Sequence, residues 1–463
     1  MNYILEFIMK ELNCDVLVVG GGPAGGVCAA TAKMNYPDKE ILVIKEYENQ
    51  LVPCAIPYVF GNTLGTSTKD VVPNAKASDT DISTLVTTIL DIDIKNKIAY
   101  SETNTISYDK LIFATGSKPF VHESLEHSLT LEGVFTIAKH KILVDELKAY
   151  SDEKNKIVIV GSGFIGVEVA VEMAASGKNV TLVSASEHIL KNAFDSEVAD
   201  QAKEIMLASG IKYIANDRVK EILDKNGDNI VNAVKLCSGK TIDAELVILA
   251  TGYKPNTELA KKVGMSQGLY GGIWVDEYMR TQNHDIFAVG DCSARRDFIT
   301  KEASKVMLAS TSAAEGRIAG SSLYGIKYLK GFSGTIAIFS TMVSSTAFSS
   351  AGVTQEQANA ANIEVVVGTF SCLNRHPGTM PGAQKQFVKI IAMKNGGQVI
   401  GGQVVGGNET GEMINIIGLA IESGLSVYSI RSMQVATHPM LTAAPTNYPI
   451  VMAAIKAINQ IER

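Results

Sequence analysis

The feature that most constrains this chain is a pattern that occurs twice: an apolar strand, a glycine-rich turn and a helix. Residues 14–19 (CDVLVV) lead into residues 20–25 (GGGPAG), and residues 157–160 (IVIV) lead into residues 161–166 (GSGFIG). Both turns match GxGxxG, and they begin 141 residues apart. Such a turn places the amide groups of a helix N-terminus against a pyrophosphate. The duplication predicts an α/β chain with two Rossmann-like units, which bind two dinucleotides or hold one dinucleotide twice.

The first unit contains every part of a dinucleotide site in the expected order. The turn and the start of the helix supply Gly20, Gly22, Pro23, Ala24 and Gly25. A helix over about residues 24–34 is rich in small residues, which lets it pack closely on the sheet, and a second strand follows at residues 40–44. A carboxylate at the end of that strand binds ribose hydroxyls, which favours Glu46, with Lys45 as the alternative at the ribose-facing position.

The second unit lacks the acid that the first one has. Its turn and helix supply Gly161, Gly163, Phe164, Ile165, Gly166 and Glu168. The second strand, residues 179–183, ends in residues 184–186 (SAS), where an acid that selects NAD would stand. Glu187 serves NAD only if the loop bends back, and no arginine stands near to hold a 2′-phosphate. The nicotinamide preference therefore stays open, and the missing cationic clamp favours NADH.

Length and charge exclude several classes of protein. A chain of 463 residues is too long for one hydrophobic core and is expected to form roughly two to four domains. Its net charge of −6 gives no basic footprint for nucleic acid. No apolar run reaches the length of a membrane span. Residues 1–9 include Glu6 and lack a basic start, so they are interpreted as a short flexible leader, and a cytoplasmic location is the default.

One cysteine, Cys54, stands between two prolines in residues 51–58 (LVPCAIPY), shortly after the first unit. The chain has six cysteines but no CxxC or cysteine–histidine cluster, which argues against a disulfide framework and against a structural zinc site. No metal is expected. The other cysteines are interpreted as small buried residues, and they are Cys14, Cys28, Cys237, Cys292 and Cys372.

Three further motifs complete the pattern around the two glycine turns. They are LIFATGSKP at residues 111–119, ATGYKPN at residues 250–256 and DIFAVGDC at residues 285–292. In this order and spacing, and over nearly the whole chain, the sequence resembles the pyridine nucleotide–disulfide oxidoreductases. The resemblance implies a flavoprotein enzyme that uses FAD and NAD(P)H.

The resemblance also implies how the chain is divided. It implies an FAD-binding domain formed by residues 1–120 and 272–328, interrupted by an NAD(P)-binding domain formed by residues 121–271. Residues 329–463 would form an α+β dimerisation domain, in a homodimer whose active sites are each completed by the partner chain. Besides the residues of the two units, the cofactor-binding residues implied are Thr115, Gly116, Gly252, Asp291 and Ser312. Ser312 lies in a helix expected over residues 308–323, whose amides would point at the flavin.

The cysteine motif places the chain in one branch of the family. The best-known members carry a pair of cysteines spaced CxxxxC, whereas this chain has Cys54 and Tyr58 at those positions. It therefore resembles the single-cysteine members: coenzyme A disulfide reductases, NADH-dependent persulfide or polysulfide reductases, and NADH oxidases and peroxidases. Pro57 before Tyr58 favours the sulfur-reducing members. A helix N-terminus after Cys54 is expected to lower the pKa of its thiol.

The implied function is reduction of a small disulfide, persulfide or polysulfide by NAD(P)H through Cys54. An NADH oxidase that reduces oxygen is the alternative, and an electron-transfer reductase for a small redox protein is a weaker one.

A proton donor is expected in the C-terminal part of the chain. His438 and Pro439 resemble the His-Pro of the two-cysteine reductases, in which a glutamate a few residues later pairs with the histidine, but here that position holds Ala443. His438 of the partner subunit is expected to protonate the leaving thiol, because the pKa of histidine lies near neutrality. Weaker candidates are Tyr448 and Tyr58, and His376 is interpreted as a surface residue.

Beyond about residue 331 the pattern changes to strands and a helix. Strands are expected over residues 335–340, 363–370, 387–392 and 399–405, and a helix over residues 412–423. That helix is apolar almost all round, as expected for one that is buried or lies at a subunit interface. Antiparallel strands are also expected around residues 87–98.

Overall fold

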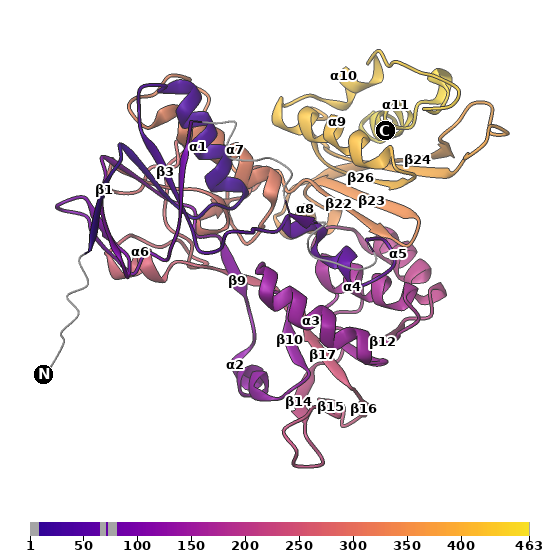
Figure 1. Ribbon diagram of the computed structural model, residues 1–463. Coiled ribbons are helices and arrows are strands. Elements are labelled where there is room, and N and C mark those ends of the chain that lie inside the picture. The colour runs from indigo at the N-terminus through magenta and orange to yellow at the C-terminus, as the bar shows by residue number, and fades with distance from the viewer. Residues whose placement is uncertain (1–8, 65–70, 73–80, 463) are drawn as a thin grey trace, which may run out of the picture.

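The computed structural model describes residues 9–64, 71–72 and 81–462 of the chain. The leader expected over residues 1–9 lies outside the described residues except for Met9. Figure 1 shows three lobes, each built around its own large sheet, which we call the first, second and C-terminal lobes. The mixed α/β fold class predicted from the two glycine turns is confirmed.

The first lobe is organised around a five-stranded parallel sheet in the order β19-β8-β2-β3-β4. Its strands are β2 (Val16–Val19), β3 (Ile41–Lys45), β4 (Ser83–Val86), β8 (Lys110–Phe113) and β19 (Ile286–Ala288). All four residues of β2 are buried because both faces of the sheet are covered. Val16 and Val18 pack with helices α1 (Pro23–Asn35) and α7 (Ala309–Ser322), whereas Leu17 packs with a smaller sheet on the other face.

That smaller sheet has four strands in the order β1-β7-β6-β5. They are β1 (Lys10–Asn13), β5 (Asp91–Asp93), β6 (Ile98–Tyr100) and β7 (Asn104–Ser107). Strands β5 and β6 form the antiparallel pair predicted for this region, but residues 87–90 are not part of it. The preceding strand, β4, instead pairs in parallel with β3 in the large sheet.

Helices α1 and α7 lie against each other on one face of the large sheet (Figure 1). A Cβ atom at Gly316 would lie 2.8 Å from the backbone oxygen of Ala24, and one at Gly320 would lie 2.5 Å from that of Cys28. Neither distance leaves room for a side chain, so the two helix backbones approach closely. Glycines of α7 therefore allow its close approach to α1.

The second lobe repeats this architecture around a parallel sheet in the order β10-β17-β11-β12-β13. Strand β11 pairs with the strand that follows its helix and with a later strand, just as β2 does in the first lobe. The parallel strands are β10 (Val134–Thr136), β11 (Lys156–Val160), β12 (Asn179–Val183), β13 (Lys212–Ile214) and β17 (Leu246–Leu249). The helices are α2 (Glu123–Glu126), α3 (Lys141–Glu153), α4 (Phe164–Ala175) and α5 (Ser196–Ala208). An antiparallel sheet is formed by β14 (Val219–Leu223), β15 (Ala233–Leu236) and β16 (Thr241–Asp243).

A two-stranded ribbon joins the first two lobes. The chain leaves the first lobe through β9 (Ser117–Pro119) and returns through β18 (Tyr253–Pro255), and these strands pair in antiparallel orientation. The Phe120 amide extends the pairing by donating to the Gly252 oxygen at 2.9 Å. The remaining short elements of the first lobe are α6 (Glu258–Lys262), β20 (Arg295–Arg296) and β21 (Ala303–Ser304).

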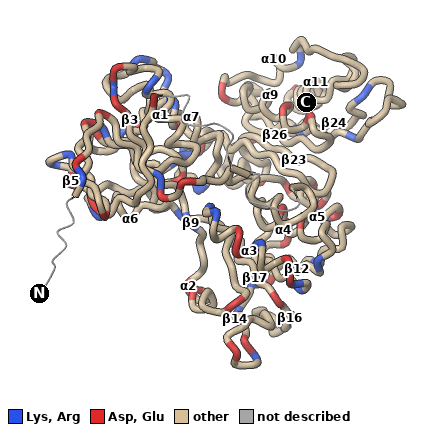
Figure 2. Tube along the Cα trace, in the orientation of Figure 1, with Lys and Arg blue, Asp and Glu red and all other residues tan. Residues whose placement is uncertain are grey.

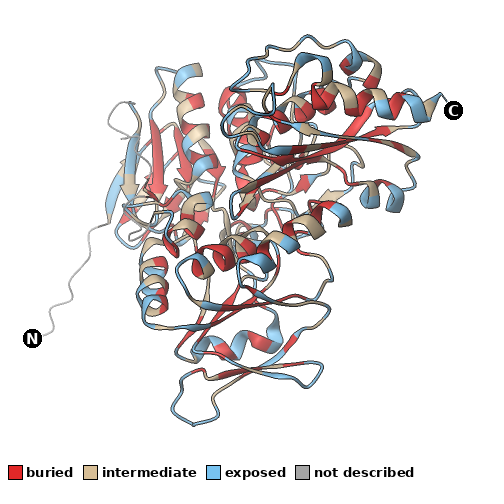
Figure 3. Cartoon of the chain, turned by 90° about the vertical axis from the view of Figure 1, so that its right-hand side faces the viewer, coloured by how far each residue is buried: buried red, intermediate tan, exposed pale blue. Residues whose placement is uncertain are grey.

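The C-terminal lobe is an antiparallel sheet in the order β22-β23-β26-β25-β24, and helices α9 and α11 pack on it. Its strands are β22 (Phe339–Val343), β23 (Thr346–Gly352), β24 (Val365–Leu373), β25 (Lys385–Met393) and β26 (Val399–Gly406). Much of this sheet is buried (Figure 3), and exposed residues occur mainly in the outer strands β22 and β24. Its helices are α8 (Gln355–Ala360), α9 (Thr410–Glu422), α10 (Val427–Arg431) and α11 (Pro449–Ile461).

The first strand predicted for this lobe was placed too early, because β22 begins at Phe339 and residues 336–338 are not in a strand. Strand β23 was not predicted.

A buried ionic cluster fastens the second lobe to the C-terminal lobe. The Lys389 side chain of β25 is 1% exposed, and its ammonium group lies 2.8 Å from the Asp195 carboxylate at the start of α5. It also contacts Glu197. Gln403 of β26 donates to the same Asp195 carboxylate at 2.7 Å. The two lobes are therefore joined by charge and hydrogen bonds as well as by apolar packing.

Lys and Arg residues are interspersed with Asp and Glu residues along the coloured trace (Figure 2). Within the described residues, no helix combines the length and apolar character needed to cross a bilayer.

Candidate active site

A cavity of about 1300 Å³ is bordered by all three lobes, and Cys54 opens into it. Most of the residues predicted to bind cofactors line this cavity. They are Gly20, Gly22, Pro23, Ala24, Glu46, Thr115, Gly116, Gly163, Phe164, Ile165, Glu168, Gly252, Asp291 and Ser312. The structure therefore brings Cys54 together with both glycine turns. Five predicted site residues do not line the cavity, namely Gly25, Lys45, Gly161, Gly166 and His438.

Four motif glycines shape the turns themselves. Gly20 and Gly161 have φ of +115° and +111°, a conformation that side chains rarely adopt. A Cβ atom at Gly25 would lie 2.0 Å from the Gly20 oxygen, and one at Gly166 would lie 1.9 Å from the Gly161 oxygen. These glycines allow each helix to start directly against the turn before it. They contribute to a ligand site by setting the course of the backbone in the turn.

The middle glycine of each turn has the opposite surroundings. A Cβ atom at Gly22 or at Gly163 would meet no protein atom within 4 Å, and both residues border the cavity. Each turn thus presents open backbone at the N-terminus of a helix, α1 in the first lobe and α4 in the second. Open backbone at a helix N-terminus is what a pyrophosphate needs, so the residues fit two dinucleotides.

We expect Gly163→Ala to weaken nucleotide binding and to leave stability nearly unchanged, because the new methyl group meets no protein atom but occupies the open face. A rise of about tenfold in KM for NADH, equal to about 1.4 kcal/mol, is expected. Gly166→Ala should instead lower the thermal midpoint, because its methyl group would overlap the Gly161 oxygen. Steady-state kinetics and thermal unfolding of both variants check this. Unchanged NADH kinetics in Gly163→Ala would show that the nucleotide does not approach this face.

Glu46 and Lys45 differ in their surroundings at the end of β3. Glu46 is exposed and borders the cavity. Lys45 is half-buried, and its aliphatic part packs beside Gly21. This geometry favours Glu46 as the residue that binds a ribose.

The end of β12 in the second lobe holds hydroxyl groups. The Ser184 hydroxyl lies 2.7 Å from that of Ser162 and 3.0 Å from that of Ser186. Glu187 is exposed in the loop beyond them.

Cys54 lies in η1 (Pro53–Val59), a 3₁₀ helix with Pro57 inside it. Its side chain is accessible from the cavity, yet it sits deep among protein atoms, and this burial raises the pKa of the thiol. The negative charge of Glu168 raises it further, whereas the Lys139 ammonium group lowers it. Burial is the largest of these influences, so the net shift of the Cys54 pKa is upward. The helix that follows is only a short 3₁₀ turn, and such a turn supplies little dipole to oppose burial.

Two carboxyl groups of α4 act on Tyr58 of η1, and one of them, Glu168, also acts on Cys54. The Thr341 hydroxyl of β22 donates to Glu168 at 2.7 Å, and the Thr63 hydroxyl donates to Glu172 at 2.7 Å. Burial, reinforced by the charge of Glu172, raises the pKa of Glu168 to about 7, although the Thr341 bond opposes this shift. Burial, with help from both carboxylates, also raises the pKa of Tyr58 to about 12. Tyr58 is therefore a neutral phenol at physiological pH.

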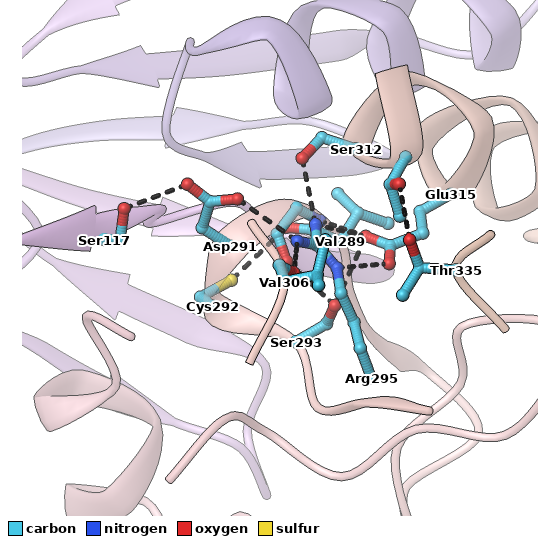
Figure 4. Close-up of polar contacts among 12 residues, drawn as sticks. Ser117, Val289, Asp291, Cys292, Ser293, Arg295, Val306, Ser312, Glu315 and Thr335 are labelled. Carbon is cyan, nitrogen blue, oxygen red and sulfur yellow. Dashed lines mark hydrogen bonds and ion pairs between the residues drawn. The ribbon is translucent and has the colours of Figure 1, made fainter. Parts of the chain in front are cut away.

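Asp291 is held at the cavity wall by a polar network that spans two lobes. Figure 4 shows the contact of Asp291 with Ser117. The Lys139 ammonium group donates to Asp291 at 2.8 Å and to the Ser117 hydroxyl at 2.8 Å. Ser117 in turn donates to Asp291 at 2.9 Å. Burial disfavours the charged form of Asp291, but Lys139 and Arg295 hold the pKa of this carboxyl below its ordinary value.

A buried ion pair supports this network from behind. The Arg295 and Glu315 side chains are 2% and 1% exposed, and Arg295 Nε lies 2.8 Å from Glu315 Oε1. Arg295 also donates to the Ser312 hydroxyl at 2.9 Å (Figure 4) and lies 3.3 Å from Asp291. The Gly290 amide donates to Glu315 at 2.7 Å. The pair thus fixes the backbone beside Asp291 and the entrance of α7.

The sequence analysis did not predict that the site includes Lys139, Arg295 and Glu315. Glu315 carried a usable signal, because it is the first charged residue in its helix and follows a run of small residues. Arg295 lies four residues after Asp291, which is a weaker signal. Lys139 carried none, because its role depends on two lobes meeting.

His438 lies in a C-terminal turn, away from the cavity of its own chain. It is exposed, its amide donates to the Thr442 hydroxyl at 3.0 Å, and its Nδ1 accepts from the Met440 amide at 3.2 Å. His376, interpreted from sequence as a surface residue, is half-buried, and its Nδ1 lies 2.9 Å from the Thr442 oxygen. The two histidine loops therefore pack together.

The other proton-donor positions in the C-terminal lobe are buried. Tyr448 is 8% exposed and packs in the core of this lobe. Ala443, at the position where a glutamate would pair with the histidine, is 2% exposed. Burial raises the pKa of Tyr448, which keeps its phenol neutral.

Comparisons with known proteins agree with this geometry. Residues 14–316 match the family described as pyridine nucleotide-disulphide oxidoreductase, and residues 338–448 match its dimerisation domain. An NADH oxidase of Methanocaldococcus jannaschii is 31% identical over 457 residues, covering 96% of this chain and 99% of the relative. An NAD(P)H coenzyme A polysulfide/persulfide reductase of Pyrococcus horikoshii is 33% identical over 405 residues, covering 85% and 87%. The structure of a NAD-dependent persulfide reductase from A. fulgidus has a TM-score of 0.87 and 27% identity, covering 97% and 84%.

Proposed function

Because this chain belongs to the pyridine nucleotide-disulphide oxidoreductase family, we propose that it reduces a small disulfide, persulfide or polysulfide through the Cys54 thiol. The chain is an FAD-dependent oxidoreductase, and members of its family bind FAD and NAD(P)H. The observation that carries the proposal is the position of Cys54. Its thiol is accessible in the same cavity that both glycine turns border.

The residues of the first lobe suit FAD, with Gly22 open to the pyrophosphate, Glu46 toward the ribose and Asp291 beside Ser117. The second glycine turn, with Gly163 open and Glu168 behind it, suits NAD(P)H. FAD held by these residues would supply the two-electron carrier between NAD(P)H and sulfur. These assignments give each dinucleotide its own helix N-terminus.

In the proposed reaction the Cys54 thiolate attacks one sulfur of the substrate, RSSR, and the other sulfur leaves as RS⁻. Two electrons from NAD(P)H then cleave the Cys54–SR bond, which releases the second RS⁻ and restores the thiolate. Each RS⁻ takes up one proton. The net reaction consumes NAD(P)H, one proton and RSSR and yields NAD(P)⁺ and two RSH. For a persulfide RSSH the products are RSH and H₂S.

An NADH oxidase that reduces oxygen is the second candidate, and the relative of that name aligns with nearly the whole chain. An electron-transfer reductase for a small redox protein is a weaker candidate, because it would need no accessible Cys54. Anaerobic NAD(P)H oxidation by the purified enzyme separates these functions when coenzyme A disulfide, a coenzyme A persulfide and polysulfide are supplied in turn, followed by oxygen. Turnover with oxygen alone would overturn the sulfur assignment.

The chain is further proposed to act as a homodimer in which His438 of the partner subunit protonates the leaving thiol. The match of residues 338–448 to a dimerisation domain and the exposure of His438 support this. A cytoplasmic location stays a prediction from the sequence.

His438→Gln is expected to lower kcat for sulfur reduction by about 10²-fold or more, because general acid catalysis commonly contributes that much. The loss should shrink with substrates whose leaving thiol has a low pKa, since these need no proton to depart. His376→Gln is the matched control, because His376 already bonds the Thr442 oxygen. A full rate in His438→Gln, or an equal loss in His376→Gln, would remove His438 from this role.

A further inference from the structure

The second lobe contributes one group to the cavity that the proposed reaction does not use. Glu168 borders the cavity together with Cys54 and Tyr58. It sits on α4, directly behind the second glycine turn, and it takes a hydrogen bond from Thr341 of the C-terminal lobe. Its carboxyl group therefore lies where the nicotinamide site and the thiol site meet.

The charged groups around Cys54 differ in how they are paired. Lys139 and Asp291 act on Cys54 with opposite signs, and they lie 2.8 Å apart in one ion pair. Their effects on Cys54 therefore largely oppose each other. Glu168 has no such partner, because among the described residues no Lys, Arg or His lies within ion-pair distance of it.

The groups that face Glu168 do not neutralise its negative charge. Glu172 stands one turn later on α4 and adds a second negative charge. Tyr58 of η1 is a neutral phenol, and Thr341 of β22 offers only a hydroxyl. The charge on Glu168 is therefore the uncompensated one beside the thiol.

We propose that Glu168 is a positioning residue that controls the ionisation of the Cys54 thiol. Protonation of the Glu168 carboxyl group increases the fraction of Cys54 that is present as the reactive thiolate. The inference rests on Cys54 being the redox thiol of the proposed function. No bond is made or broken by Glu168; it gains or loses one proton, exchanged with solvent, and acts through its charge.

The sign of the pH dependence follows from the Glu168 pKa of about 7. Below that pH, Glu168 is protonated and does not oppose the thiolate. Above it, Glu168 is ionised and its charge raises the pKa of Cys54. The thiolate fraction of the wild-type enzyme should therefore increase with pH less steeply than a single titration allows.

The test is the rate of Cys54 alkylation by iodoacetamide against pH, on reduced, FAD-loaded enzyme without nucleotide, with Cys54→Ser as the blank. In Glu168→Gln we expect the rate to match the wild type near pH 6, to exceed it several-fold near pH 8, and to converge again where both thiols are ionised. A merely structural defect would change the rate at every pH. Identical profiles for Glu168→Gln and the wild type would overturn the proposal.

Two further variants separate charge from packing. Glu172→Gln is the matched control on the same helix face, because Glu172 acts on Glu168 but is not among the groups that raise the pKa of Cys54. It should move the profile much less than Glu168→Gln does. Thr341→Val removes the bond that favours ionised Glu168, so the onset of its effect should move to higher pH. Because alkylation needs no electron acceptor, failure here is distinguishable from failure of the proposed function, which the acceptor assays test.

Discussion

Cys54→Ser is expected to abolish NAD(P)H-dependent reduction of disulfide, persulfide and polysulfide, with a loss of at least about 10³-fold in kcat/KM. A serine hydroxyl cannot form the mixed disulfide on which the proposed reaction depends, and loss of a covalent nucleophile commonly costs this much or more. The substitution removes one sulfur atom at an accessible position, so folding and cofactor binding should be retained. Oxygen reduction to hydrogen peroxide should survive, because it needs no thiol.

Cys237→Ser is the control for this experiment. Cys237 is the other exposed cysteine, so its interpretation as a buried residue was wrong, and it does not border the cavity. Both variants should retain FAD and undergo the same bleaching of flavin absorbance on addition of NADH. Sulfur reduction that persists in Cys54→Ser at more than a few per cent of the wild-type rate would exclude the proposed chemistry.

Arg295→Met is expected to destabilise the first lobe by about 3–5 kcal/mol, because it leaves the Glu315 carboxylate buried without its cation. The same substitution withdraws the guanidinium contacts to Asp291 and to the Ser312 hydroxyl. Both of those residues border the cavity, so FAD should also be released more readily. Urea unfolding, followed by circular dichroism and by flavin fluorescence, measures the two effects on one sample.

The double variant Arg295→Met with Glu315→Leu tests the stated cause. Removing both charges removes the uncompensated one, so most of the lost stability should return, as it does when buried ion pairs are replaced by apolar residues. Release of FAD should stay elevated, because the contacts to Asp291 and Ser312 are still absent. A double variant as unstable as Arg295→Met would show that packing, and not charge, causes the loss.

The sequence predicts the central strands of the two parallel sheets because each glycine turn carries its own local evidence, whereas β4, β10 and β13 were not predicted. Gly20 and Gly161 need positive φ, and Gly25 and Gly166 need close contact with the turn before them, so residue type and spacing alone identify both turns. The C-terminal lobe is antiparallel, and its pairing depends on partners distant in the chain. This is why β22 was placed too early and β23 was not predicted.

In the candidate site, too, features that depend on short motifs could be predicted and features that depend on distant parts of the chain could not. Cys54 and the cofactor-binding glycines could be identified because they belong to short motifs. The direction of the shift in the Cys54 pKa could not, because it depends on burial and on Glu168 and Lys139, which other parts of the chain supply. Likewise, no local pattern shows that Lys139 meets Asp291 across two lobes.

The ribbon formed by β9 and β18 has a consequence for the modularity of the chain. Because these strands pair side by side, the entry and exit points of the second lobe lie about one strand spacing apart, roughly 5 Å. Adjacent ends are the condition under which one unit can be inserted within another without disturbing the path of its host. The second lobe can therefore be treated as an inserted domain that is exchangeable as a unit. A different nucleotide-binding unit whose termini meet in the same way should be accepted at Phe120 and Gly252, provided that it also restores the acidic contact for Lys389 and the apolar packing against the C-terminal lobe.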